Sequence, residues 1–476
     1  MKTFKSPSGG KKLAMRVTVA ALTSACAVAP APQMEDELRS LSSALLPSVG
    51  AFPSLSAEDG LVGDGFGVVA IDTDTLAIGS PGADIDGLRD HGAVYIYQRD
   101  QTSGWKQIQK LISPTRQSGD QFGKSLAVRG DVLAVGAPTE DAPGISDQGV
   151  VHVFRRNQDG TNTWTLSGSL TNDVGSFGYF GTDLAIDDNV ILIGAPGAHG
   201  QEGAVVLRDV SFDFANLGEL RNSAGRSGEH FGHALALAGD TLAIGAPGGY
   251  EIHGSVFVFQ RLPDVTNAWS EATRIIDGSG EANAQFGEGM ALDGQTLLVS
   301  TQSVSVRIYE RDRGAPNAWG LHTILSPDAA DAYGFAYDGA VALRGDEAWV
   351  GSPSASGNGF TGQGIVYHYW HDRQNGDQWR EAPHLTAPDG LPHDSFGAHV
   401  DVNATSLVVG ATGAQGKGRA YILDTSVSLS NSATCVSLAN CAVPTTALLT
   451  PGSSITTASG ALLGAGEESL ERPMPA

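Results

Sequence analysis

The chain has 476 residues and a formal net charge of −23. A surface this acidic repels phosphate backbones and anionic membranes, which excludes nucleic acid as a partner. Hydrophobic residues make up 41% of the chain and 62 residues are glycine, a balance typical of short strands joined by many turns. Leucine-rich helical periodicity is missing, and no apolar run reaches the ~18 residues of a membrane-spanning helix. We therefore expect neither a helical solenoid nor a membrane span.

The N-terminus is typical of a targeting segment. A basic stretch precedes an apolar run of 13 residues, Val17 to Ala29, which is too short to cross a bilayer. Small residues offer a cleavage site after Ala27, so residues 1–27 are predicted to be a signal peptide. The mature chain is then exported, whether secreted, periplasmic or held at the cell surface. A lipid anchor at Cys26 is the alternative, although Thr23 stands where bacterial lipoprotein signals usually carry leucine.

Seven copies of one phrase follow a short N-terminal segment, residues 28–60. Each copy begins with Phe-Gly or a degenerate form of it, followed by a strand of alternating polarity and a turn of small residues. It ends with a second strand that closes in Gly-Ala-Pro or a variant. The copies start, at steps of 51 to 59 residues, at Phe66, Phe122, Phe180, Phe231, Phe286, Tyr337 and Phe396. A period of this size indicates a repeat architecture that merges residues 61–426 into one array.

Most of these units carry four strand signals. In five units the last strand begins at a tryptophan: Trp105, Trp164, Trp269, Trp319 and Trp379. Short strands at regular spacing predict an all-β fold, a seven-bladed β-propeller of four-stranded antiparallel blades. The seventh unit ends at Leu423 without a fourth strand. We expect a segment before the first Phe-Gly, around Ala44 to Leu55, to supply that strand and close the ring.

The phrase resembles the FG-GAP repeat, known from the seven-bladed head of integrin α subunits and from many exported bacterial proteins. The resemblance covers residues 61–426 and implies a secreted or cell-surface binding and adhesion module. Such a module would be monomeric and without catalytic activity, and its partner would be an extracellular protein or glycan. Function does not follow from fold alone, however, so two alternatives stay open.

The first alternative is a glycan-binding propeller, for which Tyr250, Phe360 and Trp370 are candidate aromatic contacts. The second is a hydrolase or lyase that acts on an extracellular polymer. That enzyme would need a cluster of acid, base and cation on one face. The sequence shows no nucleophile elbow, phosphate loop or unique Ser/His/Asp group, so we assign no catalytic residue.

Integrin-like blades often carry a calcium loop between the Phe-Gly strand and the Gly-Ala-Pro strand. Here that place holds tight turns such as Asp72-Thr73-Asp74, too short to wrap about six to eight oxygens around calcium. Two of the turns, Arg129-Gly130-Asp131 and Arg344-Gly345-Asp346, spell an integrin-recognition tripeptide, which turn chemistry explains. His368 and His371 lie three apart, so a strand points them to opposite faces and we predict no zinc site from this pair.

The best candidate site lies in the connection after Gly-Ala-Pro, which is 13 residues long in units one, two and six and shorter elsewhere. Variable loops on a rigid scaffold are where binding usually resides. In units one and two this connection carries six acidic residues: Asp84, Asp86, Asp90, Glu140, Asp141 and Asp147. They are predicted to meet a cationic protein surface. Asp84, Asp86 and Asp90 are also the candidates for a calcium site, and solvated turn residues are the third interpretation.

From residue 427 the chain is a low-complexity tail, rich in Ser, Thr, Ala, Gly and Pro, which we expect to be disordered. If Cys26 leaves with the signal peptide, Cys435 and Cys441 are the cysteines that remain. An even pair in an exported chain predicts a disulfide between them. Two unrelated thiols are the alternative.

Overall fold

The structure is a computed structural model that describes most of residues 52–425, together with two short strands in the tail. Residues within 52–425 that it does not describe are 101–103, 116, 158–159, 172–174, 176, 188, 212, 224, 249–252, 264–267, 278–283, 303–304, 328–339 and 358. The predicted signal peptide, the possible anchor at Cys26, the degenerate phrase at Tyr337 and the predicted disulfide therefore lie outside the described residues.

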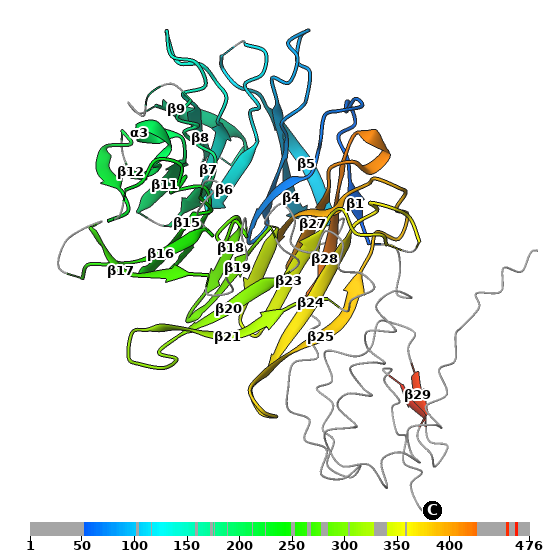
Figure 1. Cartoon of the computed structure of the whole chain (residues 1–476). Helices are drawn as coiled ribbons and strands as arrows, with labels where there is room; N and C mark the ends of the chain where they lie inside the picture. The colour runs from blue at the N-terminus through cyan, green and yellow to red at the C-terminus, as the bar shows by residue number, and fades with distance from the viewer. Residues whose placement is uncertain are drawn as a thin grey trace, which may run out of the picture. The chain divides into compact units, whose positions relative to one another are not determined.

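Within the described residues the chain forms seven four-stranded antiparallel sheets (Figure 1). Blades one to four contain β2 (Val68–Asp72), β3 (Thr75–Ser80), β4 (Ala93–Asp100), β5 (Gly104–Leu111); β6 (Ser125–Arg129), β7 (Val132–Ala137), β8 (Val150–Arg156), β9 (Trp164–Leu170); β10 (Leu184–Ile186), β11 (Val190–Ala195), β12 (Ala204–Asp209), β13 (Asn216–Leu220); β14 (Leu235–Ala238), β15 (Thr241–Ala246), β16 (Ser255–Arg261) and β17 (Trp269–Ile276).

Blades five to seven contain β18 (Met290–Asp293), β19 (Thr296–Ser300), β20 (Val306–Arg311), β21 (Trp319–Leu325); β22 (Val341–Arg344), β23 (Glu347–Ser352), β24 (Ile365–Asp372), β25 (Gln378–Leu385); β26 (Phe396–Val402), β27 (Ser406–Ala411), β28 (Arg419–Asp424) and β1 (Ser54–Leu55). Sequence-neighbouring strands pair inside each blade except at β1. The tryptophans predicted to open the fourth strands lie in those strands.

The first strands of successive blades contact one another all the way round, and β2 against β26 completes the circle. The predicted seven-bladed β-propeller is therefore confirmed. Its last blade combines both parts of the chain, because β1 pairs antiparallel with β28 in a register that places Ser54 opposite Tyr421. The backbone N–H of Ile422 also donates to the carbonyl of Pro53 at 3.0 Å. The ring-closing strand thus comes from within the predicted segment 44–55.

The hydrophobic core lies between the blades. Second strands such as β3, β7 and β15 are buried along their whole length, since adjacent blades cover both of their faces. One core cluster joins Ile96 of the first blade to Leu133 and Trp164 of the second. Each blade is therefore stabilised mainly by its neighbours, as expected of a repeat protein.

A contact between two glycine backbones explains the repeated phrase. A Cβ atom on Gly79, at the end of β3, would stand 2.1 Å from the carbonyl oxygen of Gly123 in the next blade. Gly92, just before β4, forms a parallel bridge with Phe122, and a Cβ there would stand 2.2 Å from the Phe122 oxygen. The buried Phe122 ring meanwhile packs edge-on against Phe154 of its own blade. The Phe-Gly pair thus lies at the junction between two blades, where its backbone contacts glycines of the preceding blade. A residue with a Cβ at those glycine positions would clash with that backbone.

Helical structure in the described residues is confined to two loop segments, α3 (Ala198–Gln201) and η3 (Ala414–Gly416). None of the described helices is long and apolar enough to span a membrane. In the tail, β29 (Ser454–Thr456) pairs antiparallel with β30 (Leu462–Gly464). The remainder of the predicted disordered tail lies outside the described residues.

Candidate functional site

The propeller has two unlike faces, because every blade runs its strands in the same order. The loop face carries the connections between second and third strands and the segments that lead into each Phe-Gly. The hairpin face carries the turns between first and second strands and between third and fourth strands. The predicted acidic residues lie on connections of the loop face.

The acidic loops of blades one and two share one conformation. Each contains a tight antiparallel bridge, between Ile85 and Leu88 in the first loop and between Ala142 and Ile145 in the second. In the first loop, the carboxylate of Asp84 accepts a hydrogen bond from the Asp90 backbone N–H at 3.0 Å. Asp141 and Asp147 repeat this contact in the second loop at 2.8 Å. Local hydrogen bonds therefore define both loops.

Both loops are also fastened to the following blade. The backbone N–H of Gln121 donates to the Asp90 carbonyl at 3.0 Å, and that of Tyr179 donates to the Asp147 carbonyl at 3.2 Å. These contacts hold the backbone of both acidic loops in place at the junctions between blades. A site fixed in this way loses little conformational entropy when it binds a partner.

Five of the six predicted acidic residues reach the surface, and Glu140 does not. Asp84, Asp86, Asp90 and Asp141 are exposed and Asp147 is half-buried, whereas 1% of Glu140 is exposed. The Glu140 carboxylate turns into the blade, where it lies 2.9 Å from Nε2 of the buried His152. The Ser113 hydroxyl also donates to it, at 3.4 Å. A buried carboxylate needs such partners. The prediction that Glu140 belongs to the acidic surface cluster is therefore wrong.

Apart from Phe360, which was a candidate for glycan binding, the exposed apolar side chains on the same face were not anticipated from the sequence. The described connections of the loop face expose seven large hydrophobic residues: Leu61, Val62, Ile112, Phe177, Tyr179, Phe360 and Leu391. Val62 is 80% exposed and Phe177 54%. Phe177 lies beside the second acidic loop, since its backbone N–H donates to the Ser146 carbonyl at 2.9 Å. Single apolar residues in loops carry no periodic pattern, so sequence alone gave no signal that the other six are exposed on this face.

The three aromatic residues suggested for glycan binding do not come from one element. Phe360 is exposed in the long loop of blade six, while Trp370 is half-buried in β24 with the Arg380 guanidinium 5.8 Å from its ring centre. Tyr250 lies outside the described residues. The glycan alternative therefore stays a prediction.

The hairpin face holds the tight turns that the sequence predicted in place of calcium loops. Their carboxylates already bind backbone: Asp187 Oδ1 accepts from the N–H groups of Asn189 and Val190, both at 2.7 Å. Turns of two or three residues with their oxygens engaged in this way do not fit a calcium ion. The calcium chemistry of integrin-like blades is accordingly not assigned to these turns.

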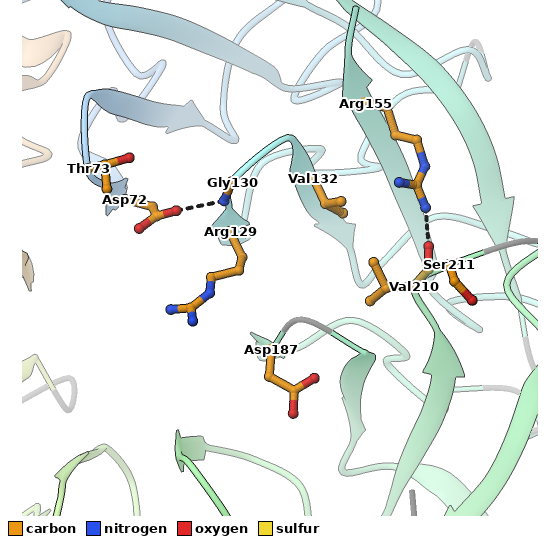
Figure 2. Close-up of a pocket in the computed structure, with 9 residues that line it drawn as sticks. All are labelled: Asp72, Thr73, Arg129, Gly130, Val132, Arg155, Asp187, Val210 and Ser211. Atoms are coloured by element: carbon orange, nitrogen blue, oxygen red, sulfur yellow. Dashed lines mark hydrogen bonds between the residues drawn. The ribbon is translucent and has the colours of Figure 1, made fainter. Parts of the chain in front are cut away.

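The two Arg-Gly-Asp turns join neighbouring blades. The N–H of Gly130 donates to the Asp72 carboxylate of the previous blade at 2.6 Å, beside a surface cavity of about 630 Å³ that Arg129 and Asp187 also line (Figure 2). The N–H of Gly345 donates to Asp293 in the same way at 2.5 Å. These contacts agree with the interpretation of both tripeptides as structural turns.

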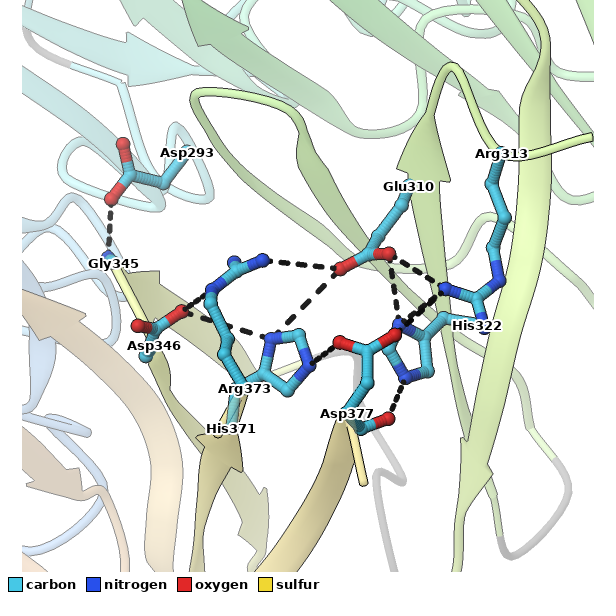
Figure 3. A network of polar contacts seen from close by, with 9 residues as sticks. All are labelled: Asp293, Glu310, Arg313, His322, Gly345, Asp346, His371, Arg373 and Asp377. Atoms are coloured by element: carbon cyan, nitrogen blue, oxygen red, sulfur yellow. Dashed lines mark hydrogen bonds and ion pairs between the residues drawn. The ribbon is translucent and has the colours of Figure 1, made fainter. Parts of the chain in front are cut away.

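A second polar cluster, which the sequence did not reveal, lies on the hairpin face between blades five and six (Figure 3). It brings together Glu310 near the end of β20, His322 of β21 and His371 near the end of β24, with ligand-type atoms that all lie within 4.8 Å of one another. His322 Nδ1 is 2.9 Å from Glu310 Oε2. The two imidazoles meet edge to face, with ring centres 4.9 Å apart.

Charged side chains surround this cluster. Arg313 lies 2.9 Å from Glu310 Oε2, and Arg373 lies 3.8 Å from Oε1. Burial and the nearby Arg373 guanidinium lower the pKa of His371. The three residues of the cluster come from two blades and are up to 61 residues apart (310→371), so no local sequence motif marks them. His368, which with His371 was predicted to form no zinc site, is not a member of this cluster.

Comparison with known proteins agrees with this architecture. Four segments match the FG-GAP repeat, residues 53–97, 105–154, 216–259 and 379–423. Three of these segments begin at or near the fourth strand of one blade and end in the third strand of the next, while the first begins at β1. The propeller therefore contains FG-GAP repeats at four positions, in agreement with the predicted resemblance.

The chain is also similar to integrin alpha-M of Mus musculus. The two are 31% identical over 176 residues, which is 33% of this chain and 14% of that protein. This chain thus matches a small part of the integrin's length. Together the repeats and this similarity support an FG-GAP protein of the integrin α type, consistent with an integrin-like binding module.

Proposed function

We propose that this protein is an exported protein-binding and adhesion module without catalytic activity, and that its loop face binds a cationic protein surface. The observation that carries the proposal is the coincidence of exposed acidic and exposed apolar side chains on that face. Asp84 and Asp141 stand on loops held by backbone hydrogen bonds, and Phe177 and Tyr179 are exposed beside the second loop.

This combination suits recognition between proteins. Aromatic residues at the centre of an interface supply most of the binding free energy once they are desolvated. Carboxylates around them speed association with a basic partner and disfavour acidic ones. The net charge of −23 means that the whole molecule, and not only this face, attracts basic partners and repels acidic ones. Export is supported by the basic and apolar pattern of residues 1–27, and adhesion by the similarity to an integrin α subunit.

Photo-crosslinking on intact source cells would test the proposal. A photoreactive amino acid replaces Phe177 in the full chain, and a control chain carries it at Leu262, which is 38% exposed beyond the end of β16 on the hairpin face. We expect one adduct from position 177 that is absent from position 262 and disappears when Asp84, Asp86 and Asp141 are changed to asparagine. Mass spectrometry should identify a basic protein in that adduct.

Four results would contradict the proposal. Equal labelling from both positions would mean that the loop face is not selective. No labelling from position 177 would argue against a protein partner there. An adduct lost after enzymatic deglycosylation of the cells would favour the glycan-binding alternative. Detection of the chain inside the cell, with residues 1–27 retained, would refute export.

A further inference from the structure

Two buried atoms in the cluster between blades five and six have no hydrogen-bond partner among the described residues. They are Oε1 of Glu310 and Nδ1 of His371, and they lie 3.9 Å apart. The side chain of His371 is fully buried, and that of Glu310 is 15% exposed. Unsatisfied buried polar atoms are rare in native proteins and each calls for a physical reason.

The remaining contacts set which imidazole nitrogens carry hydrogen. Nε2 of His371 lies 2.9 Å from the Asp377 carboxylate, and Nε2 of His322 lies 2.9 Å from the Asp377 backbone carbonyl. Both partners are acceptors only, so each neutral ring places its hydrogen on Nε2. The Nδ1 lone pair of His322 then faces Glu310 Oε2 at 2.9 Å, and that of His371 lies 3.9 Å from Glu310 Oε1 and 3.7 Å from Asp346 Oδ1, all of them acceptors. Three electron-pair donors converge, which is the arrangement that a cation stabilises.

We propose that Glu310, His322 and His371 bind one divalent transition-metal ion, and that zinc fits the site best. Two imidazole nitrogens and one carboxylate oxygen are typical zinc ligands, whereas calcium and magnesium prefer oxygen alone. Ligand atoms about 2.0–2.2 Å from zinc stand roughly 3.4 Å from each other in a tetrahedral site. All three ligand atoms lie within 4.8 Å of one another, and Glu310 and His371 are 3.9 Å apart, so small side-chain rotations would bring them to this spacing.

The surroundings of the three ligands resemble those of known metal sites. Ligating histidines usually donate their second ring N–H to a carboxylate or a carbonyl, and Asp377 supplies one of each. The flat face of His371 also stacks on Trp379, with ring centres 4.9 Å apart and planes 15° apart, which fixes the ring orientation. Three protein ligands leave the fourth position of a tetrahedral zinc ion for water.

Arg313 is the competitor for the metal. Its Nη1 lies 2.9 Å from Glu310 Oε2 and 3.1 Å from His322 Nδ1, where it takes up lone pairs that the ion needs. Its side chain is 38% exposed and also pairs with Asp377 at 3.4 Å, so it has room to turn toward solvent when an ion binds. The proposal therefore predicts that removing the Arg313 charge strengthens metal binding, an effect that a purely structural ion-pair network would not produce.

A second network in the same protein provides a matched control. On blade three, His199 lies 2.8 Å from Glu219, which also pairs with Arg221 at 2.5 Å. This group repeats the histidine, glutamate and arginine of the cluster but no second histidine joins it among the described residues. Substitution of His199 should leave metal binding unchanged.

The test measures cobalt and zinc binding to the full chain after removal of metal with a chelator. Cobalt reports its coordination through visible absorption, and zinc competition gives the dissociation constant. We expect one equivalent of metal to be lost in His371→Gln and in Glu310→Gln, and retained in His199→Gln. Metal bound elsewhere, for example by cysteines, contributes equally to every variant and is removed when their stoichiometries are subtracted. Asp377→Ala should weaken zinc binding by about 10–100-fold because it removes the carboxylate that orients the His371 ring, while the backbone carbonyl that contacts His322 remains.

The Arg313→Gln variant distinguishes a metal site from a purely structural network of ion pairs. Tighter zinc binding in that variant, with an unchanged circular dichroism spectrum, would support the site. Identical metal stoichiometry in the wild type, His371→Gln and His199→Gln would overturn it. Absence of metal binding in both the wild type and Arg313→Gln would also overturn it and leave a metal-free ion-pair network. Every variant is checked by its melting curve, so a misfolded chain is not counted as a lost site.

Discussion

Adding one methyl group at the contact between two glycine backbones tests the explanation of the repeated phrase. We choose Gly245→Ala, at the junction of blades four and five. The new Cβ would stand 2.1 Å from the Gly287 carbonyl oxygen and 3.2 Å from its carbon. Ordinary van der Waals contact requires roughly 1 Å more. The two nearest atoms belong to the Gly287 backbone, so no side chain is able to relieve the clash by rotating away.

The expected magnitude follows from overpacking. Extra methyl groups in packed cores cost about 1–3 kcal/mol, and the reduced entropy of the unfolded chain returns about 0.4–1 kcal/mol. Because backbone must move and the ring is closed, we expect a net loss in the upper part of this balance, about 2 kcal/mol. Against total stabilities of roughly 5–15 kcal/mol, this is a large fraction for one methyl group.

Gly239→Ala is the matched control. Gly239 lies six residues away in the turn between β14 and β15, with a φ of +56° and no atom within 4 Å of the place that the new methyl group would take. Alanine there bears only the cost of the left-handed conformation, about 1–2 kcal/mol, offset by the same entropy gain. Urea unfolding followed by circular dichroism and by tryptophan fluorescence gives both free energies, and agreement of the two probes checks the two-state assumption. If Gly245→Ala lost no more stability than Gly239→Ala, close backbone packing would not be the reason for the repeated glycine.

Three further predictions concern other parts of the propeller. Deleting residues 28–55 removes β1 and leaves β28 without its partner, so we expect loss of cooperative thermal unfolding; an equally sharp melt at the same temperature would show that β1 does not close the ring. Burial raises the pKa of Asp401 to about 6, against about 4 in the unfolded chain. The folded state therefore keeps this proton longer, and the group's contribution to stability falls as pH rises from about 4 to 6. Asp401→Asn should gain about 1–3 kcal/mol relative to the wild type between pH 4 and pH 7 in urea titrations, and a difference independent of pH would refute this. If Asp84 and Asp86 bind calcium, a hundredfold excess over the dissociation constant should stabilise the protein by about 2.7 kcal/mol relative to EDTA, and the double asparagine variant should lose that rise; a melt unchanged by calcium would remove the calcium prediction.

The fold was predictable because its signature is local and repeated. The distance between Gly79 and Gly123 is set by backbone, so the same residue type must recur at each junction and the period becomes visible in sequence. The exception supports this view. Ser300 takes the place of the Gly-Ala-Pro glycine in unit five, and Asp338 takes the place of its partner glycine in unit six. Ser300 and Asp338 are therefore the two residues expected to meet at the junction of blades five and six, so both replacements of glycine concern a single contact.

The candidate sites were less predictable, because side-chain direction and contacts between blades are not local properties. The acidic loops could be found from their length and composition, but the burial of Glu140 depends on His152, which belongs to the following strand. The cluster of Glu310, His322 and His371 depends on how two blades pack, and spacing along the chain does not encode that. Exposed apolar residues such as Phe177 gain meaning only from their neighbours on the loop face.

The shared seventh blade also has a consequence for the order of events during biosynthesis. Ser54 and its partner Tyr421 are separated by 367 residues (421 − 54), and translation covers that distance in roughly 20–70 s. Throughout this interval β1 has no partner, and six blades accumulate as an open arc whose two ends both expose strand edges. Such edges are prone to pair with other chains. Closure by the last blade is therefore the step at which the nascent chain escapes aggregation, and we expect chaperone dependence to be greatest just before residues 419–424 emerge.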